Sequence, residues 1–133
     1  MVNPALDTAL ITGAAGFIGS HLADRLLAEG HRVIGIDNLS RGGRSNLEEA
    51  LRHPAFQFFE ADLTDLNSFR RIVADFHITT VWHMAANSDI PAGIGDPNVD
   101  FRDTFLTTFN TLLVMREAEI PKLAFASTSA VYG

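Results

Sequence analysis

Cysteine is absent from the 133 residues, and its absence excludes several kinds of chemistry at once. The chain has no disulfide framework, no thiolate zinc site and no cysteine nucleophile. The five histidines show no metal-ligand spacing either. His77 precedes an expected strand and His83 lies near its end, so they do not share a helical face, and we predict no metal site.

Long apolar runs and clustered cations are also missing. No stretch is long enough to span a bilayer, and the N-terminus lacks the basic and apolar regions typical of a signal peptide. The formal net charge is −6, and the basic patch of Arg41 with Arg44 is small. Nucleic-acid binding requires clustered Lys and Arg. We therefore predict a cytoplasmic protein that binds neither nucleic acid nor a membrane.

Apolar residues make up 47% of the chain and charged residues 20%, which is typical of a folded globular domain. The length suits one domain without a second beside it. Short apolar runs alternate along the chain with stretches of helical periodicity. The expected strands are 9–12, 31–36, 56–61, 79–84 and 122–127, and the expected helices are 17–29, 45–53, 63–76 and 97–119.

The expected helix boundaries carry recognisable signals. Ser45 and Glu48 have the spacing of a capping box, and Pro54 closes that helix. Asp96 and Pro97 supply an N-cap and a first-turn proline. Residues 87–96 are the one long irregular loop, of a kind that often borders a ligand. Strands joined by helices predict a doubly wound α/β fold with a parallel, Rossmann-like sheet of about five strands.

The segment GAAGFIG, residues 13–19, lies between the first strand and the first helix. Gly13 permits a tight turn, Gly16 lets a diphosphate approach the backbone, and Gly19 lets helix and strand pack closely. The exposed N–H groups and the helix dipole then favour an anion. A bare glycine pattern is weak, but its position at the first strand-to-helix turn predicts dinucleotide binding.

Two aspartates at strand ends are candidate nucleotide ligands. Asp37 lies 18 residues beyond Gly19, where a carboxylate accepts hydrogen bonds from the adenosine ribose and repels a 2′-phosphate. A simple turn role is the alternative, and we favour ribose binding over it. Arg41 and Arg44 still leave room for NADP. Asp62 fits either an adenine contact or helix capping, and the residues alone support these two interpretations equally.

For the other polar side chains near strand ends we favour structural roles. His83 is more consistent with a hydrogen-bonded structural histidine than with an acid or base. Ser127, Thr128 and Ser129 have no histidine or acid placed to activate them as nucleophiles. We expect hydrogen bonding from these hydroxyls instead.

Several segments together resemble the extended short-chain dehydrogenase/reductase family, the NAD-dependent nucleotide-sugar epimerases and dehydratases. They are ITGAAGFIGSHL, IDNLSRGGRSNLEE, ADLTD, VWHMAAN, DPNVDF and FASTSAVYG, which cover nearly the whole chain. DNLSRGGRSNL, HMAAN and STSAVYG look most like the UDP-glucose 4-epimerases. UDP-glucuronate decarboxylases and sugar-nucleotide 4,6-dehydratases are close alternatives, as is an NAD-binding module without catalysis.

The resemblance assigns roles to individual positions. Thr128 matches the Ser or Thr that contacts the substrate hydroxyl undergoing oxidation, which makes it the candidate catalytic residue. Thr104 stands where the family often has an asparagine near the cofactor. The residues implied in NAD binding are Gly13, Gly16, Phe17, Ile18, Gly19, Asp37, Asn38, Asp62, Leu63, Ala85 and Ala86.

The base of the resembled family is the tyrosine of a Tyr-x-x-x-Lys pair on the helix after the fifth strand. A phenol with a pKa of about 10 needs the lysine at i+4 to act as a base at neutral pH. Tyr132, the only tyrosine, is followed by Gly133 alone and matches the structural tyrosine of VYG. We therefore expect an N-terminal part of a family member. It would be an incomplete NAD-binding domain over 1–133, without a substrate domain, and inactive alone.

The helix expected over 97–119 carries apolar residues across a wide arc, including Phe101, Phe105 and Phe109. This arc is wider than one sheet face needs. In the resembled family the same helix contributes to a dimer interface. We therefore expect the chain to expose apolar surface here and to form a homodimer or to self-associate through it, while a nucleotide sugar is the substrate of the whole protein.

Overall fold

The computed structural model describes residues 7–132, and within them five parallel strands form one sheet. The spatial order is β3-β2-β1-β4-β5, so the chain reverses its direction of travel at β1. Thr12 is paired with Ile36 on one side and with His83 on the other. The expected doubly wound, Rossmann-like fold is confirmed. The strands are β1 (Thr8–Thr12), β2 (Arg32–Asp37), β3 (Phe56–Glu60), β4 (Ile78–His83) and β5 (Lys122–Phe125).

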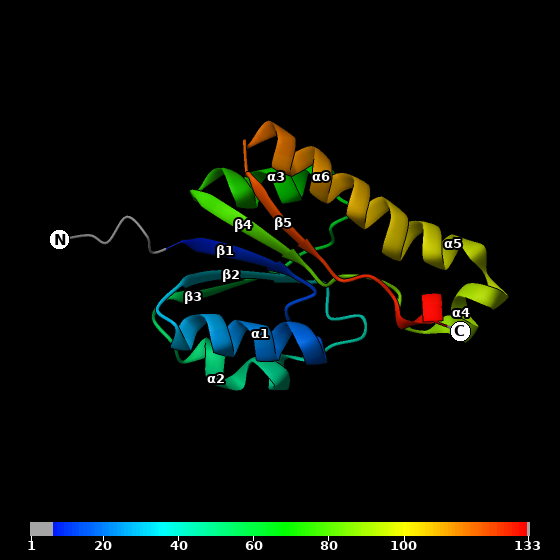
Figure 1. Ribbon diagram of the computed structural model, residues 1–133, viewed down its shortest axis with the longest axis horizontal. Coiled ribbons are helices and arrows are strands. Elements are labelled where there is room, and N and C mark those ends of the chain that lie inside the picture. The colour runs from blue at the N-terminus through cyan, green and yellow to red at the C-terminus, as the bar shows by residue number, and fades with distance from the viewer. Residues whose placement is uncertain (1–6, 133) are drawn as a thin grey trace.

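Helices cover both faces of this sheet (Figure 1). On one face lie α1 (Phe17–Ala28) and α2 (Glu48–Leu51), and on the other lie α3 (Leu66–Ala74) and α6 (Thr107–Glu117). Side chains alternate along a strand, so β1 directs Ile11 into the apolar cluster under α1 and Leu10 into the cluster under α3 and α6. Trp82, the only tryptophan, is partly buried against the α1 cluster.

Two helices end in left-handed residues. After α1, Gly30 has φ 91°, which confirms the expected glycine stop. After α6, Glu119 takes the same role with φ 56°, although it is not a glycine. The N–H of Ile120 then donates to the Met115 carbonyl (2.9 Å), closing a Schellman motif.

The capping box expected at Ser45 and Glu48 is wrong. The segment begins as a 3₁₀ turn, η1 (Arg44–Leu47), and continues into α2, and neither has a side-chain cap. The reason is a contact distant in sequence. Asn46 donates from its side-chain amide to the Ala15 carbonyl (2.8 Å), so the loop is shaped by its attachment to the glycine turn.

The loop expected over 87–96 contains a short helix, α4 (Ile90–Gly95), whose first turn is capped by the Asp89 carboxylate. The long helix follows, and the expected Asp96 cap is confirmed because its carboxylate accepts the Asn98 N–H (3.0 Å). This helix is composite: α5 (Pro97–Asp100) leads into a π-helical segment, η2 (Phe101–Leu106), and then into α6. The sequence pattern did not predict the π segment.

The helix expected over 63–76 is shorter, because Asp65 caps α3 by accepting the Ser68 N–H (3.2 Å). A 3₁₀ turn, η3 (Ser129–Tyr132), follows β5. Within residues 7–132, no helix has the length and apolar character that crossing a bilayer requires.

Candidate functional site

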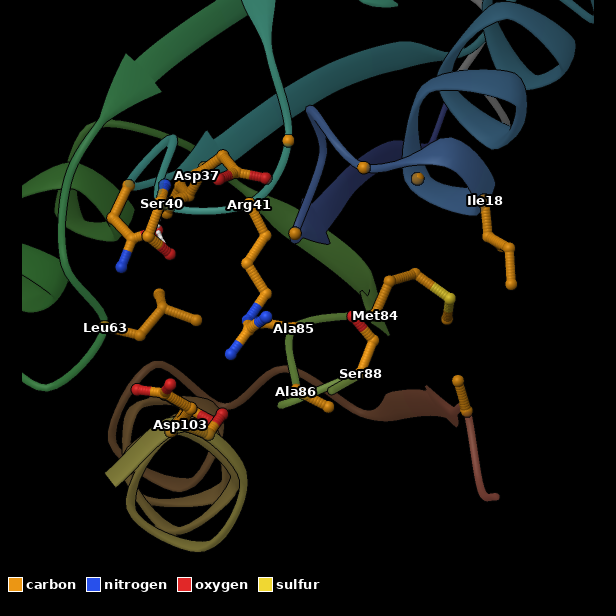
Figure 2. Close-up of a pocket in the computed structure, with 18 of the residues that line it drawn as sticks. Ile18, Asp37, Ser40, Arg41, Leu63, Met84, Ala85, Ala86, Ser88 and Asp103 are labelled. Carbon is orange, nitrogen blue, oxygen red and sulfur yellow. Dashed lines mark hydrogen bonds between the residues drawn. The ribbon is translucent and has the colours of Figure 1, made fainter. Parts of the chain in front are cut away.

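A pocket of about 310 Å³ opens at the carboxyl ends of β1, β2 and β4, where the strand order reverses (Figure 2). Doubly wound sheets bind their ligands at such switch points. The pocket brings together all the residues that the sequence suggested for cofactor binding: Gly13, Gly16, Phe17, Ile18, Gly19, Asp37, Asn38, Asp62, Leu63, Ala85 and Ala86.

The glycine turn has the close packing expected of it. Gly13 has φ 68°, and a Cβ there would lie 2.8 Å from the Ala85 backbone nitrogen. A Cβ on Gly19 would overlap the Gly13 carbonyl oxygen, so helix α1 rests directly on the turn. Gly16 caps α1 without a side-chain bond, and the first turn of α1 holds no acidic residue. The start of α1, residues 17–19, lines the pocket, and no side-chain cap occupies this helix N-terminus.

Asp37 holds the glycine turn from the neighbouring strand. One carboxylate oxygen accepts the Ala15 N–H (2.9 Å), and the other accepts the Leu39 N–H (2.8 Å). The turn role considered for this residue is thus present. Each oxygen has a second lone pair, and the side chain lines the pocket, so the carboxylate retains acceptors for a ligand. Ribose binding by Asp37 stays a prediction.

Asp62 also combines a turn with a place in the pocket. Its Oδ1 accepts both the N–H (2.9 Å) and the hydroxyl (2.7 Å) of Thr64. The helix cap itself is Asp65, so capping does not account for Asp62. Leu63 is fixed from α6, because the Asn110 amide donates to its carbonyl (2.8 Å).

His83 is buried, with 2% of its surface exposed, and both ring nitrogens have partners. The Thr12 hydroxyl lies 2.7 Å from Nδ1 and the Thr108 hydroxyl 2.9 Å from Nε2. The Thr12 oxygen already accepts the N–H groups of Met84 (3.1 Å) and Ala85 (3.2 Å). A hydroxyl has two acceptor sites, so we assign its hydrogen to the bond with Nδ1, which also lies 3.4 Å from the Thr111 hydroxyl.

This hydrogen-bond order makes His83 a neutral ring that carries its proton on Nε2. Thr108 is consistent with it, because its hydroxyl donates to the Thr104 carbonyl (2.7 Å) and can accept from Nε2–H. Burial lowers the pKa of His83 to about 4. The histidine therefore holds the end of β4 in place, in agreement with the structural role favoured from the sequence.

The long helix presents a different residue to the pocket from the one the sequence singled out. Thr104 accepts the Asn87 N–H (2.9 Å) and does not line the pocket. Asp103 and Thr107 line it instead. Sequence reasoning missed both, because it considered only Thr104 in this part of the helix.

Thr128 lies between β5 and η3, is exposed, and is not among the residues that line the pocket. Ala126, two residues earlier, does line it. Tyr132 is 90% exposed. The structure thus places the end of β5 at the pocket and Thr128 just beyond its wall.

The loop after β2 adds a wall that the sequence did not identify. Ser40, Arg41 and Gly42 line the pocket, and a Cβ on Gly42 would overlap the Ala15 carbonyl oxygen. The Arg41 guanidinium reaches within 3.6 Å of the Asp89 carboxylate, which lies just before α4. The only indication of this wall in the sequence was the basic patch of Arg41 and Arg44. That patch alone did not predict that Arg41 faces the pocket.

These features fit a dinucleotide. The pocket volume of about 310 Å³ lies within the range of small-molecule sites. Uncapped helix N–H groups suit the diphosphate, and the strand-end carboxylates suit a ribose. The fold and the pocket together define the class of Rossmann-type dinucleotide-binding domains.

The chain belongs to the NAD dependent epimerase/dehydratase family, whose sequence profile matches residues 9–133. It is 38% identical over 125 residues to a UDP-glucose 4-epimerase of Mycolicibacterium smegmatis, covering 93% of this chain and 40% of that protein. It is 34% identical to a UDP-glucuronate 4-epimerase of Thermodesulfobacterium geofontis, covering 92% of this chain and 40% of that protein. The chain thus spans about 40% of the length of these curated relatives.

Solved structures agree. The UDP-glucose 4-epimerase of Thermus thermophilus, solved in complex with NAD, matches with a TM-score of 0.83 and 39% identity, over 91% of this chain and 37% of that one. The enzyme of Bifidobacterium longum, solved with NAD+ and UDP, matches with a TM-score of 0.88 and 30% identity, over 95% and 38% of the chains. The family description and these structures confirm NAD as the expected cofactor.

Proposed function

We propose that these 133 residues bind NAD as the cofactor-binding part of a nucleotide-sugar epimerase of the UDP-glucose 4-epimerase type. The single observation that carries the proposal is the pocket itself. It joins the uncapped N-terminus of α1 to the strand-end carboxylates of Asp37 and Asp62 at the switch point of the sheet.

Each part of the pocket has a role in this proposal. The α1 N–H groups after Gly16 receive the diphosphate, Asp37 accepts the adenosine ribose hydroxyls, and Asp62 with Leu63 borders the adenine. Asn38, beside Asp37, lines the same end. Bound NAD+ supplies the hydride acceptor for oxidation at C4 of the sugar. The protein's contribution here is to hold and orient that cofactor.

Proton transfer needs groups that these residues do not supply together. Their one tyrosine is Tyr132, and no Tyr-x-x-x-Lys pair occurs among the 133 residues. We propose that this chain binds NAD without turning over a sugar nucleotide, and that turnover requires the Tyr-x-x-x-Lys pair. Thr128, exposed just beyond the pocket, is proposed to hydrogen-bond the sugar hydroxyl that is oxidised, once the substrate is held there.

Calorimetric titration of the purified chain with NAD+ tests the proposal. We expect saturable binding that Asp37→Ala abolishes. Since Asp37 also holds Ala15 and Leu39, the less disruptive Asp37→Asn is titrated beside it, and circular dichroism checks that both variants fold. Saturable binding by the wild type with no loss in either folded variant would contradict the ribose role. A folded wild type that does not bind NAD+ would refute the proposed function.

A UDP-glucose turnover assay with added NAD+ tests the absence of catalysis. We expect no interconversion by this chain, although it binds the cofactor. Measurable epimerisation that follows the concentration of purified chain would overturn this part of the proposal, because another group would then have to serve as the base.

We also propose that two copies associate through the composite helix. The supporting observation is its exposed apolar face: Phe101, Phe105 and Phe109 are 57%, 61% and 52% exposed, and Phe125 of β5, 53% exposed, lines the same groove as Phe101 and Phe105. A face this apolar is typical of an interface. Light scattering should show dimers or larger species that Phe105→Glu disperses. Ile94→Glu, at a 78% exposed site on α4, is the matched control.

A further inference from the structure

The side chains that line the pocket carry more negative than positive charge, although the proposed ligand is an anion. Among the described residues that line it, Asp37, Asp62 and Asp103 are acids and Arg41 is the one cation. Arg102, which does not line the pocket, pairs with Asp103 (2.7 Å). The α1 N–H groups donate hydrogen bonds to a diphosphate but bring no formal charge. Arg41 is thus the group in the wall that can neutralise a bound phosphate.

The position of Arg41 is fixed by the loop on which it stands. A glycine at 42 lets the loop lie against the Ala15 carbonyl, and the Gly43 N–H donates to that same oxygen (3.2 Å). Asn46 adds a second bond to it (2.8 Å). The backbone of Arg41 is therefore attached beside the glycine turn. Figure 2 shows its side chain extending from the loop into the pocket.

The partner that Arg41 has in this structure is a weak one. Its guanidinium lies 3.6 Å from the Asp89 carboxylate, and the two side chains are 39% and 45% exposed. This distance exceeds a good N–H···O hydrogen bond, and water screens the pair. Asp89 has a separate role, because its other oxygen accepts the Ala92 N–H (3.1 Å) and caps α4. Because both side chains reach solvent, separating the pair would not bury an unpaired charge.

A phosphate would be the better partner. A guanidinium presents its N–H groups in a planar fork that bonds a phosphate through two parallel hydrogen bonds. From these observations we propose that Arg41 binds the diphosphate of the dinucleotide and exchanges Asp89 for it when the pocket fills. This inference rests on the proposed function, because the ligand is the same dinucleotide.

A double-mutant cycle on NAD+ affinity tests the exchange. Arg41→Gln should weaken binding about tenfold, the effect of losing one charge-assisted pair. Asp89→Asn retains the cap acceptor and releases Arg41, so it should tighten binding, and the double variant should bind like Arg41→Gln alone. If Arg41 served only to support α4 through Asp89, both single variants would weaken binding alike, and the exchange would be refuted.

Ligand fragments identify which phosphate Arg41 contacts. The loss in Arg41→Gln should be the same for ADP-ribose as for NAD+, and absent for adenosine, which has no phosphate. The same substitution should lower the affinity for NADP+ by the same factor as the affinity for NAD+. A loss confined to NADP+ would assign Arg41 to the 2′-phosphate and overturn the diphosphate assignment.

Two further variants separate charge, geometry and folding. Arg41→Lys retains the charge but not the planar fork, so its affinity should lie between those of the wild type and Arg41→Gln. Arg44→Gln is the matched control, since Arg44 stands at the end of the same loop, packs over Phe58 and does not line the pocket. A folded wild type that fails to bind NAD+ would refute the proposed function and this inference with it. A wild type that binds, with Arg41→Gln unchanged, would refute only the inference.

Discussion

The Thr12 hydroxyl at the end of β1 donates a hydrogen bond to Nδ1 of His83 at the end of β4, although the two residues are 71 positions apart. The same oxygen accepts the Met84 and Ala85 N–H groups. One side chain therefore orients the histidine and fixes the start of the segment that lines the pocket. Protonating Nδ1 would turn an acceptor into a donor facing this hydroxyl.

Stability should fall in mild acid because of His83. Burial lowers its pKa to about 4 in the folded chain, whereas the unfolded side chain titrates near 6.5. Between these values the unfolded chain binds more protons. The contribution of His83 to the free energy of unfolding is therefore fully present above pH ~6.5. It is lost as the pH falls toward 4, by about 3 kcal/mol in total. Urea unfolding at a series of pH values measures it. His83→Gln should flatten the slope, and an unchanged slope in that variant would contradict the assignment.

Thr12→Val should destabilise the fold by about 1–3 kcal/mol, because it removes the buried hydroxyl that accepts the Ala85 N–H and makes the shorter contact to His83 Nδ1. The two side chains have nearly the same shape, so the loss reports hydrogen bonding. Thr12→Ser, which retains the hydroxyl, is the control. Urea unfolding gives the free energies. Equal stability of the valine and serine variants would show that the hydroxyl is dispensable.

Glu119→Gly should stabilise the protein by about 0.5–1 kcal/mol, because glutamate at φ 56° is strained in a position that glycine adopts freely. This gain exceeds the extra entropy of an unfolded glycine. Glu119→Ala removes the same charge without relieving the backbone, so it should bring no such gain. Thermal unfolding of the three proteins compares them. A gain shared by both variants would assign the effect to charge.

Gly19→Ala should cost about 1–3 kcal/mol and strongly reduce NAD+ binding, because the new methyl group overlaps the Gly13 carbonyl and forces α1 off the turn. Gly95→Ala is the matched control, since a Cβ there meets nothing within 4 Å. Thermal unfolding and calorimetric titration are both needed. Normal binding by Gly19→Ala would show that the turn tolerates a displaced helix.

The fold and most of the site were predictable because their signals are local. The glycine turn, Asp37 and the alanines after β4 all stand where a strand ends, and strand ends in a parallel sheet meet at one edge. The capping box at Ser45 failed because a distant contact, from Asn46 to Ala15, shapes that loop.

Arg41 and Asp103 escaped prediction for related reasons. Arg41 faces the pocket because its loop is held on the glycine turn, and Asp103 faces it because the long helix packs over the carboxyl end of the sheet. Neither arrangement has a signature in the neighbouring residues. Both depend on how separate elements pack in three dimensions.

The place of Trp82 gives the molecule its own optical reporter. As the only tryptophan, it accounts for all indole fluorescence, and it lies one residue before His83 in the strand that leads into the pocket. Its emission should respond when the sheet separates from α1, so unfolding can be followed without a label. Reduced nicotinamide absorbs where indole emits, and NADH bound at the end of the same strand should therefore quench Trp82 by energy transfer while its own emission rises.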